Sequence, residues 1–137
     1  MSKISGPLLD RVDLHVEVTP VKYKNLGSDD LGESSEEIKK RVNKARKMQF
    51  ERYKEFGIYS NSELTPKLSD KYCILDEKGK IILQNAFDKL GLSARAYGRI
   101  LKVARTIADL ENSKNILFNH IAEAIQYRSL DRKYWGN

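Results

Sequence analysis

One segment near the start of the sequence alternates apolar and polar residues, and its isolation constrains the fold more than any other feature. The alternation predicts a half-buried β-strand, which Pro20 ends because proline cannot donate to a strand ladder. The residues expected on its apolar face are Val12, Leu14, Val16 and Val18. No later segment alternates as well, and a single strand is unstable without partners. The strand is therefore expected to pair with a second copy of the chain or, as we prefer, with a sheet in a part of the protein beyond these residues.

The remainder of the sequence predicts a series of helices. A polar, glycine-containing stretch over residues 25–35 is expected to form a linker. Ser34 and Glu37 have the spacing of a capping box and predict the start of a helix. This helix ends near Phe56, where Gly57 suits a left-handed C-cap. Its expected buried residues are Ile38, Val42, Ala45, Met48 or Gln49, and Tyr53.

Further capping residues predict four more helices. The expected N-caps are Thr65, which precedes Pro66 and a helix to about Tyr72, then Asp76, whose helix is closed by Gly91, and Ser93. The last helix starts near Asn119. After the short Thr65 helix, the next helix has a helical stripe of Ile81, Ile82, Asn85, Ala86, Lys89 and Leu90. The helix capped by Ser93 has a row of Tyr97, Leu101, Ala104 and Ala108, flanked by Ile100 and Ile107, and the expected buried residues of the last helix are Ile121, Ala122, Ile125 and Leu130. The predicted fold is mainly α, a small helical bundle preceded by one unpaired strand.

Composition excludes several classes of protein. The chain has 137 residues and one cysteine, Cys73, so it forms no internal disulfide, which is typical of the reducing cytoplasm. Cys73 lies in an apolar run and is expected to be an unreactive core residue. No apolar run approaches the roughly 20 residues of a membrane span, and no signal-peptide pattern is present. We expect a cytoplasmic protein without membrane contact.

Motifs that would give the chain its own chemistry are absent. There is no G-x-x-x-x-G-K-[ST] sequence to cradle phosphates, no nucleophile elbow and no H-E-x-x-H motif. His15 and His120 are far apart in the sequence, and with one cysteine they form no metal-ligand set. We expect the chain alone to catalyse nothing and to bind neither a metal ion nor a nucleotide.

Two arginines stand at positions that suit contact with a phosphate. Arg11 follows a tight apolar turn directly before the strand. It either pairs with Asp10 or Asp13 as an ordinary turn residue, or stabilises charge on a transferring phosphoryl group. Arg95 lies in the first turn of the helix capped by Ser93, where the macrodipole disfavours a cation. It is therefore either placed for a ligand or an ordinary solvated arginine.

Basic residues also gather in two stripes. Arg99 and Lys102 follow Arg95 at positions i+4 and i+7. On an earlier helix, the basic face between Lys39 and Lys54 is either a solvated surface or a nucleic-acid surface. The net charge of +6 favours polyanionic partners without establishing one. The candidate DNA contacts are Lys40, Lys44, Lys47, Arg99 and Lys102.

Three segments resemble the C-terminal part of the magnesium-chelatase-like AAA+ ATPases of the ComM/YifB type. They are Ser5–Val18 (SGPLLDRVDLHVEV), Leu92–Leu110 (LSARAYGRILKVARTIADL) and His120–Arg132 (HIAEAIQYRSLDR). The second block is highly specific, and the resemblance spans nearly the whole chain in family order. It implies that the chain is the C-terminal piece of a longer ATPase, whose Walker A and B motifs precede Met1.

The resemblance also implies a division of the chain and roles for two residues. Residues 1–20 would be the end of the αβα core, residues 21–35 a linker, and residues 36–137 the C-terminal helical lid. Arg11 matches an arginine finger that reaches the neighbouring subunit's nucleotide, and Arg95 matches the sensor-2 arginine of the lid. The full-length protein would be a homohexamer that uses ATP and Mg²⁺, contacts its own AAA+ core, and drives DNA branch migration during natural transformation.

Without the resemblance, two other functions remain open. One is a stand-alone basic helical module that binds DNA, and the other is an interaction domain with no ligand. The unpaired strand argues against both, because a self-sufficient module does not leave an apolar strand edge exposed. We therefore predict the ATPase fragment.

Overall fold

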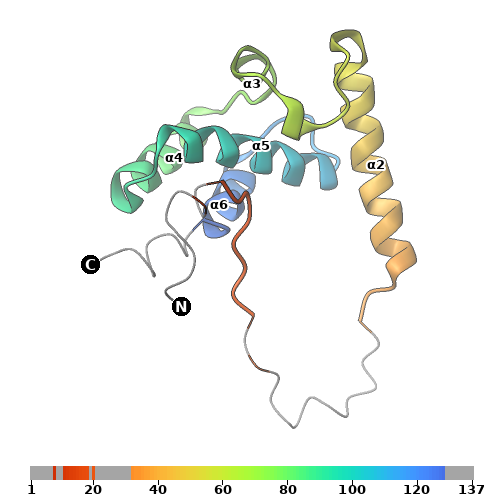
Figure 1. Ribbon diagram of the computed structural model, residues 1–137, viewed down its shortest axis with the longest axis horizontal. Coiled ribbons are helices and arrows are strands. Elements are labelled where there is room, and N and C mark those ends of the chain that lie inside the picture. The colour runs from red at the N-terminus through yellow and green to blue at the C-terminus, as the bar shows by residue number, and fades with distance from the viewer. Residues whose placement is uncertain (1–7, 9–10, 19, 21–31, 129–137) are drawn as a thin grey trace.

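The computed structural model describes residue 8, residues 11–18, residue 20 and residues 32–128, and these ranges are mainly helical (Figure 1). The helices are α2 (Ser35–Tyr53), α3 (Pro66–Tyr72), α4 (Glu77–Leu90), α5 (Ala94–Leu110) and α6 (Phe118–Gln126), with 3-10 turns η2 (Lys54–Phe56) and η3 (Asn61–Glu63) between α2 and α3. Within the described ranges there is no sheet, only an isolated parallel bridge between Leu75 and Ile116. The predicted small helical bundle is confirmed.

The helix starts are set by local hydrogen bonds, as the sequence predicts. Side-chain oxygens accept a backbone N–H three residues later at Ser34 (3.2 Å), Thr65 (3.4 Å), Asp76 (2.7 Å) and Ser93 (3.1 Å). Two helix ends are set by glycines in the left-handed region, Gly57 with φ 69° and Gly91 with φ 59°. No helix among the described residues is long and apolar enough to cross a membrane.

The core lies between α5 and the helices packed against it. In Figure 1, α5 runs across the bundle with α6 beside it, and α4 precedes it in the chain. Of the residues predicted for the α5 row, Ile100, Leu101, Ala104, Ile107 and Ala108 are buried. Tyr97 is instead half-exposed, because it lines a surface hollow described below.

The predicted buried face of α4 is wrong by part of a turn. Ile81 is 58% exposed, whereas Leu83, which the pattern left out, is buried. The reason is the contact with α6: a Cβ at Gly79 would lie 3.9 Å from Ile121 Cγ1, so the backbone of α4 approaches α6 along the line of Gly79 and Leu83. Ile82 is half-buried on this same side.

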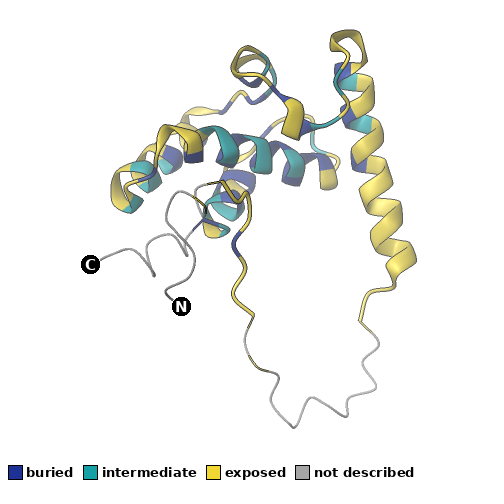
Figure 2. Cartoon of the chain, viewed as in Figure 1, coloured by how far each residue is buried: buried dark blue, intermediate teal, exposed yellow. Residues whose placement is uncertain are grey.

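Only half of α2 belongs to the bundle. Its C-terminal half is docked through Ala45, Gln49 and Tyr53, which are buried as predicted. Its N-terminal half projects away, and Ile38 and Val42, also predicted to be buried, are 42% and 40% exposed (Figure 2).

Residues 11–18 take no regular secondary structure, so the predicted strand has no ladder here. A strand needs a neighbouring strand, and this segment lies beside helices. The side chains on its predicted apolar face are exposed, while His15, from the opposite face, is buried. The backbone N–H of His15 donates to the carbonyl of Tyr127 at 2.8 Å. The sheet that we expect to cover the apolar face stays a prediction.

Candidate functional site

A basic row on α5 borders a hollow of about 740 Å³. Because Ser93 caps α5, Arg95 lies in its first turn and Arg99 and Lys102 follow on the same side. All three line the hollow, as their spacing predicts, together with Tyr97. Other walls come from the η3–α3 region, from the end of α6 and from residues 13 and 14.

The charged groups of Arg99 and Lys102 bond to other groups of the chain. The guanidinium of Arg99 pairs with the carboxylate of Asp13. Lys102 Nζ donates to the carbonyl oxygen of Ser62 at 2.9 Å. Arg95 is exposed at the start of the row, where a helix N-terminus also favours an anion. The row brings three cationic side chains to the hollow, which is also lined by Asp13, Asp70 and Glu123.

The other predicted functional arginine, Arg11, lies in a turn two residues before Asp13, the partner of Arg99. Its side chain is exposed, and its backbone N–H donates to the carbonyl of Leu8 at 3.0 Å. The alternative pairing with Asp13 is not what the structure shows, because Asp13 is bonded to Arg99. Asp10, the other alternative partner, lies outside the described residues.

Two further contacts attach the Arg11 segment to the end of α6. The guanidinium of Arg128 donates to the backbone carbonyl of Val12. The N–H of His15 bonds the carbonyl of Tyr127. Arg128 is only 1% exposed and is among the largest fully buried side chains of the described residues. The segment that follows Arg11 is thus bonded to α5 and to the end of α6 within four residues.

A buried carboxylate joins α2 to α5. Asp109 accepts two hydrogen bonds from Arg52, at 3.0 and 2.5 Å, and one from Asn61 Nδ2 at 2.9 Å. Arg105 also pairs with it at 3.2 Å. Burial alone would lower the pKa of Arg52, but its hydrogen bonds to Asp109 and Tyr53 raise it overall. Arg52 falls within the basic face predicted between Lys39 and Lys54, but it pairs with Asp109 and is not part of a solvated surface.

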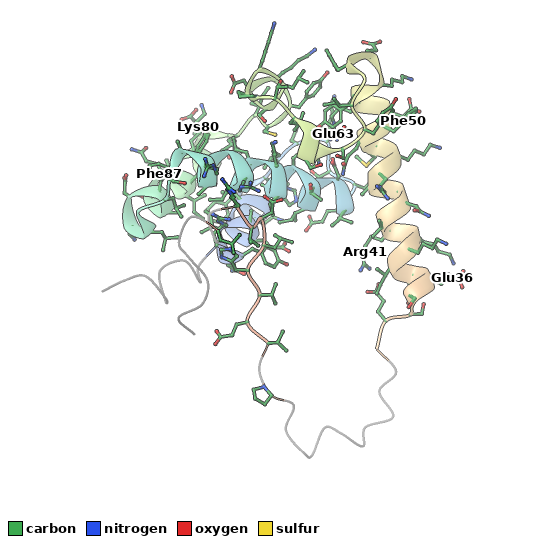
Figure 3. All side chains as sticks on the ribbon, viewed as in Figure 1. Glu36, Arg41, Phe50, Glu63, Lys80 and Phe87 are labelled. Atoms are coloured by element: carbon green, nitrogen blue, oxygen red, sulfur yellow. The ribbon has the colours of Figure 1, made fainter. Side chains whose placement is uncertain are left out.

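The candidate DNA contacts fall on two separate helices. Lys40, Lys44 and Lys47 are exposed on α2, and Arg99 and Lys102 are on α5. Acidic residues accompany the α2 group: Lys40 pairs with Glu36 at 2.9 Å, and Arg41 pairs with Glu33. Glu36 and Arg41 stand on the projecting half of α2 in Figure 3. This surface is of mixed charge rather than a continuous basic stripe.

The remaining candidates for chemistry are buried in the core. Burial raises the pKa of the Cys73 thiol to about 11, which fits the unreactive role predicted for it. His120 is buried, with Nδ1 accepting the N–H of Leu117 at 2.9 Å and Nε2 2.8 Å from Glu111. It caps the start of α6. Among the described residues, no group of three or more histidine, cysteine or acidic side chains gathers to hold a metal ion.

Sequence reasoning missed Asp109 and Arg128. For Asp109 a signal existed, because Arg105 and Asp109 are four residues apart inside an apolar helical stretch. For Arg128 the sequence holds no such local signal, since the carbonyl that it contacts is 116 residues earlier.

Comparison with known proteins identifies a family model and several relatives that match most of this chain. The family model described as "Magnesium chelatase, subunit ChlI C-terminal" matches residues 32–128. The chain is 43% identical over 133 residues to "Competence protein ComM" of Haemophilus influenzae. It is 41% and 40% identical over 134 residues to "Uncharacterized protein YifB" of Salmonella typhimurium and of Escherichia coli. Each match covers 96% of this chain, which spans about a quarter of the length of each relative. The chain therefore belongs to the magnesium-chelatase-like family, as its C-terminal domain.

Proposed function

We propose that this chain is the nucleotide-responsive C-terminal part of a magnesium-chelatase-like AAA+ ATPase. The observation that carries the proposal is one arrangement: the cationic row headed by Arg95 lines a hollow, and the segment after Arg11 is bonded to the same helix. Arg95 then contacts the nucleotide of its own subunit, as the sensor-2 residue of the lid. Arg11 acts as the arginine finger on the nucleotide of the neighbouring subunit in a homohexamer.

The chemistry of the row suits the phosphates of ATP and its Mg²⁺. A guanidinium is planar and permanently charged, so it binds phosphate oxygens through two parallel hydrogen bonds. A hollow of about 740 Å³ is in the size range of small-molecule sites. The chain has no P-loop, whose backbone amides and lysine hold phosphates. Tight ATP binding and hydrolysis therefore need the AAA+ core of the longer protein.

The proposed finger role of Arg11 rests on the stage of phosphoryl transfer at which positive charge is needed. Charge spreads over the transferred group's oxygens in the transition state, and a guanidinium supplied from outside the nucleotide pocket stabilises it there. Arg11 is exposed at a turn, so its guanidinium is accessible to a neighbouring molecule. We assign Arg11 to turnover and Arg95 to both nucleotide binding and turnover.

The work that the ATPase drives is DNA branch migration in natural transformation. The "Competence protein" name of the Haemophilus influenzae relative and the net charge of +6 support this part of the proposal. Lys40, Lys44 and Lys47 are the candidate DNA contacts on α2. Arg99 and Lys102 are the weaker candidates, because Asp13 and the Ser62 carbonyl already bond their charged groups.

A subunit-mixing experiment in the full-length protein tests the finger. Arg11→Ala is expected to lower ATP turnover by about 10³–10⁵-fold while ATP binding is retained. Subunits with a disabled Walker A motif are also inactive. Mixed hexamers bring an intact P-loop against an intact Arg11 at some interfaces, so the mixture regains ATPase activity that neither variant has alone.

A matched arginine and an assembly measurement control this experiment. Arg46→Ala removes an exposed arginine of α2 outside the proposed contacts and is expected to keep wild-type turnover. Native mass spectrometry shows whether the two inactive subunits co-assemble. A mixture that co-assembles and stays inactive rules out Arg11 as a finger acting between subunits.

A further inference from the structure

Arg128 is a buried cation whose described hydrogen bond goes to the main chain beside Arg11. It is 1% exposed, and its guanidinium donates to the carbonyl oxygen of Val12, the residue directly after Arg11. We infer that Arg128 is the positioning residue that fixes the Arg11 turn on the lid, so that a lid movement carries the finger with it. This inference rests on the proposed function of Arg11.

The burial of Arg128 requires an explanation. Arginine is among the residues that are almost never fully buried unless paired, because removing its charge from water is costly. A hydrogen bond from a charged donor is stronger and shorter than a neutral one, so it fixes its acceptor more firmly. The acceptor of the described bond is the backbone carbonyl of Val12, in the Arg11 segment.

Two neighbouring contacts act on the same segment. The N–H of His15 bonds the carbonyl of Tyr127, the residue before Arg128, at 2.8 Å. Asp13 pairs with Arg99 on α5, one turn after Arg95. The residues that follow Arg11 are thus bonded both to the end of α6 and to the helix that carries the proposed nucleotide contact of the same subunit.

The proposed reaction is sensitive to such placement. A displacement of about 1 Å at a catalytic group can cost about 10²-fold in rate. Arg128 touches neither nucleotide in this proposal. It acts through the Val12 carbonyl, and its loss changes where Arg11 stands rather than how tightly a subunit holds its own ATP.

A second buried arginine provides a control within the same bundle. Arg105 is 3% exposed and donates to the backbone carbonyls of Ser113 and Lys114, at 2.7 and 3.0 Å. Like Arg128, which follows α6, it donates to the backbone of an irregular segment. That segment is the loop after α5 and has no part in the proposed site. Arg105 also pairs with Asp109 at 3.2 Å, so its substitution reports the cost of losing a buried arginine together with that ion pair, away from the proposed site.

The experiment compares Arg128→Lys with Arg105→Lys in the full-length protein. Lysine keeps the charge but lacks the planar fork, so both variants are expected to lower the melting temperature. Each is assayed at the same interval below its own melting temperature. Arg128→Lys is expected to lower kcat by about 10²-fold with KM for ATP unchanged, whereas Arg105→Lys keeps kcat.

Subunit mixing distinguishes a positioning role from a merely structural one, because only a positioning defect is expected to be complemented in ATP turnover. Arg128→Lys subunits keep an intact P-loop but present Arg11 poorly, so mixing them with Walker-A-disabled subunits is expected to restore turnover, as it does for Arg11→Ala. Arg128→Gln, which also removes the charge, serves as a second variant if Arg128→Lys retains high activity.

Each alternative outcome has a defined meaning. If Arg11→Ala is complemented and neither Arg128 variant loses kcat beyond the Arg105→Lys level, the inference is overturned and the finger proposal stands. The same holds if the Arg128 variants lose activity that mixing does not restore. If Arg11→Ala itself is not complemented in co-assembled hexamers, the proposed function falls and the inference falls with it.

Discussion

The bundle holds α2 and the segment after Arg11 in different ways, at two contacts that we call the first and the second joint. At the C-terminal end of α5 it holds α2 through a buried carboxylate, Asp109, which Arg52, Asn61 and Arg105 surround. Nearer the start of α5, and at the end of α6, it holds the Arg11 segment mostly by that segment's main chain. The carboxylate at the centre of the first joint is buried, whereas Val16 and Val18, which follow the second joint, are 66% and 86% exposed.

The difference teaches what each joint is for. A charge-paired network buried between two helices holds them in one arrangement and resists opening. Backbone contacts that leave the apolar side chains of the same segment uncovered stabilise the isolated domain little. They do fix where that segment runs. We therefore expect changes at the first joint to appear in stability, and changes at the second to appear in activity.

The largest effect on folding is expected at Asp109. Asp109→Ala leaves Arg52 and Arg105 without the buried carboxylate, and removing one partner of a buried ion pair costs about 3–5 kcal/mol. Urea unfolding of the 137-residue chain measures this loss. The control is Asp88→Ala, an exposed acidic residue of α4, which is expected to change stability by less than about 0.5 kcal/mol. A loss as small as the control's would mean that the carboxylate does not hold the joint.

The thiol of Cys73 reports opening of the same joint. Burial is the main reason that its pKa is raised from 9.0 to about 11, and Arg105, Arg52 and Asp109 are near enough to act on its titration. At pH 8 its thiolate fraction is then about 10²-fold lower than for the unperturbed thiol, and a thiol reagent is expected to react at least that much more slowly. Unfolding in urea restores the rate. Asp109→Ala is expected to speed the labelling of Cys73. Equal labelling rates in the wild-type and Asp109→Ala proteins would show that exposure of Cys73 does not depend on the first joint.

The smallest effect is expected for the ion pair of the second joint. Asp13 is about half exposed at its side chain and pairs with Arg99, so Asp13→Asn is expected to cost less than about 1 kcal/mol, with most of the effect lost in high salt. Thermal unfolding at low and high ionic strength measures it. A loss as large as that of Asp109→Ala would show that the two joints do not differ as described.

The fold was predictable where it depends on neighbours in the sequence. Ser93 and Gly91 set helix ends by bonds and backbone conformations within a few residues, and both were predicted correctly. The face of α4 was not, because Ile81 and Leu83 are equally apolar and only the approach of α6 decides which is covered. Docking likewise decides burial in α2, where Val42 is uncovered although its helical position matches that of Ala45 and Gln49.

The site divides in the same way. The row of Arg95, Arg99 and Lys102 follows from helical spacing, and its common hollow confirms that geometry. Their roles, like that of Arg11, stay predictions. The contact of Arg128 could not be predicted from the sequence. Its described acceptor is a backbone carbonyl, which every residue type has, so the identity of residue 12 gives no signal.

The bond between Arg128 and Val12 also sets an order of events during synthesis. It joins residues 116 positions apart, so one end is made early and the other only when α6 is complete. Contacts of such long sequence separation form late in folding, because closing the loop costs entropy before the contact is gained. A nascent or truncated chain that stops short of residue 128 has Arg11 but not its anchor. The Arg11 segment thus gains this bond only when translation has passed α6 and reached residue 128.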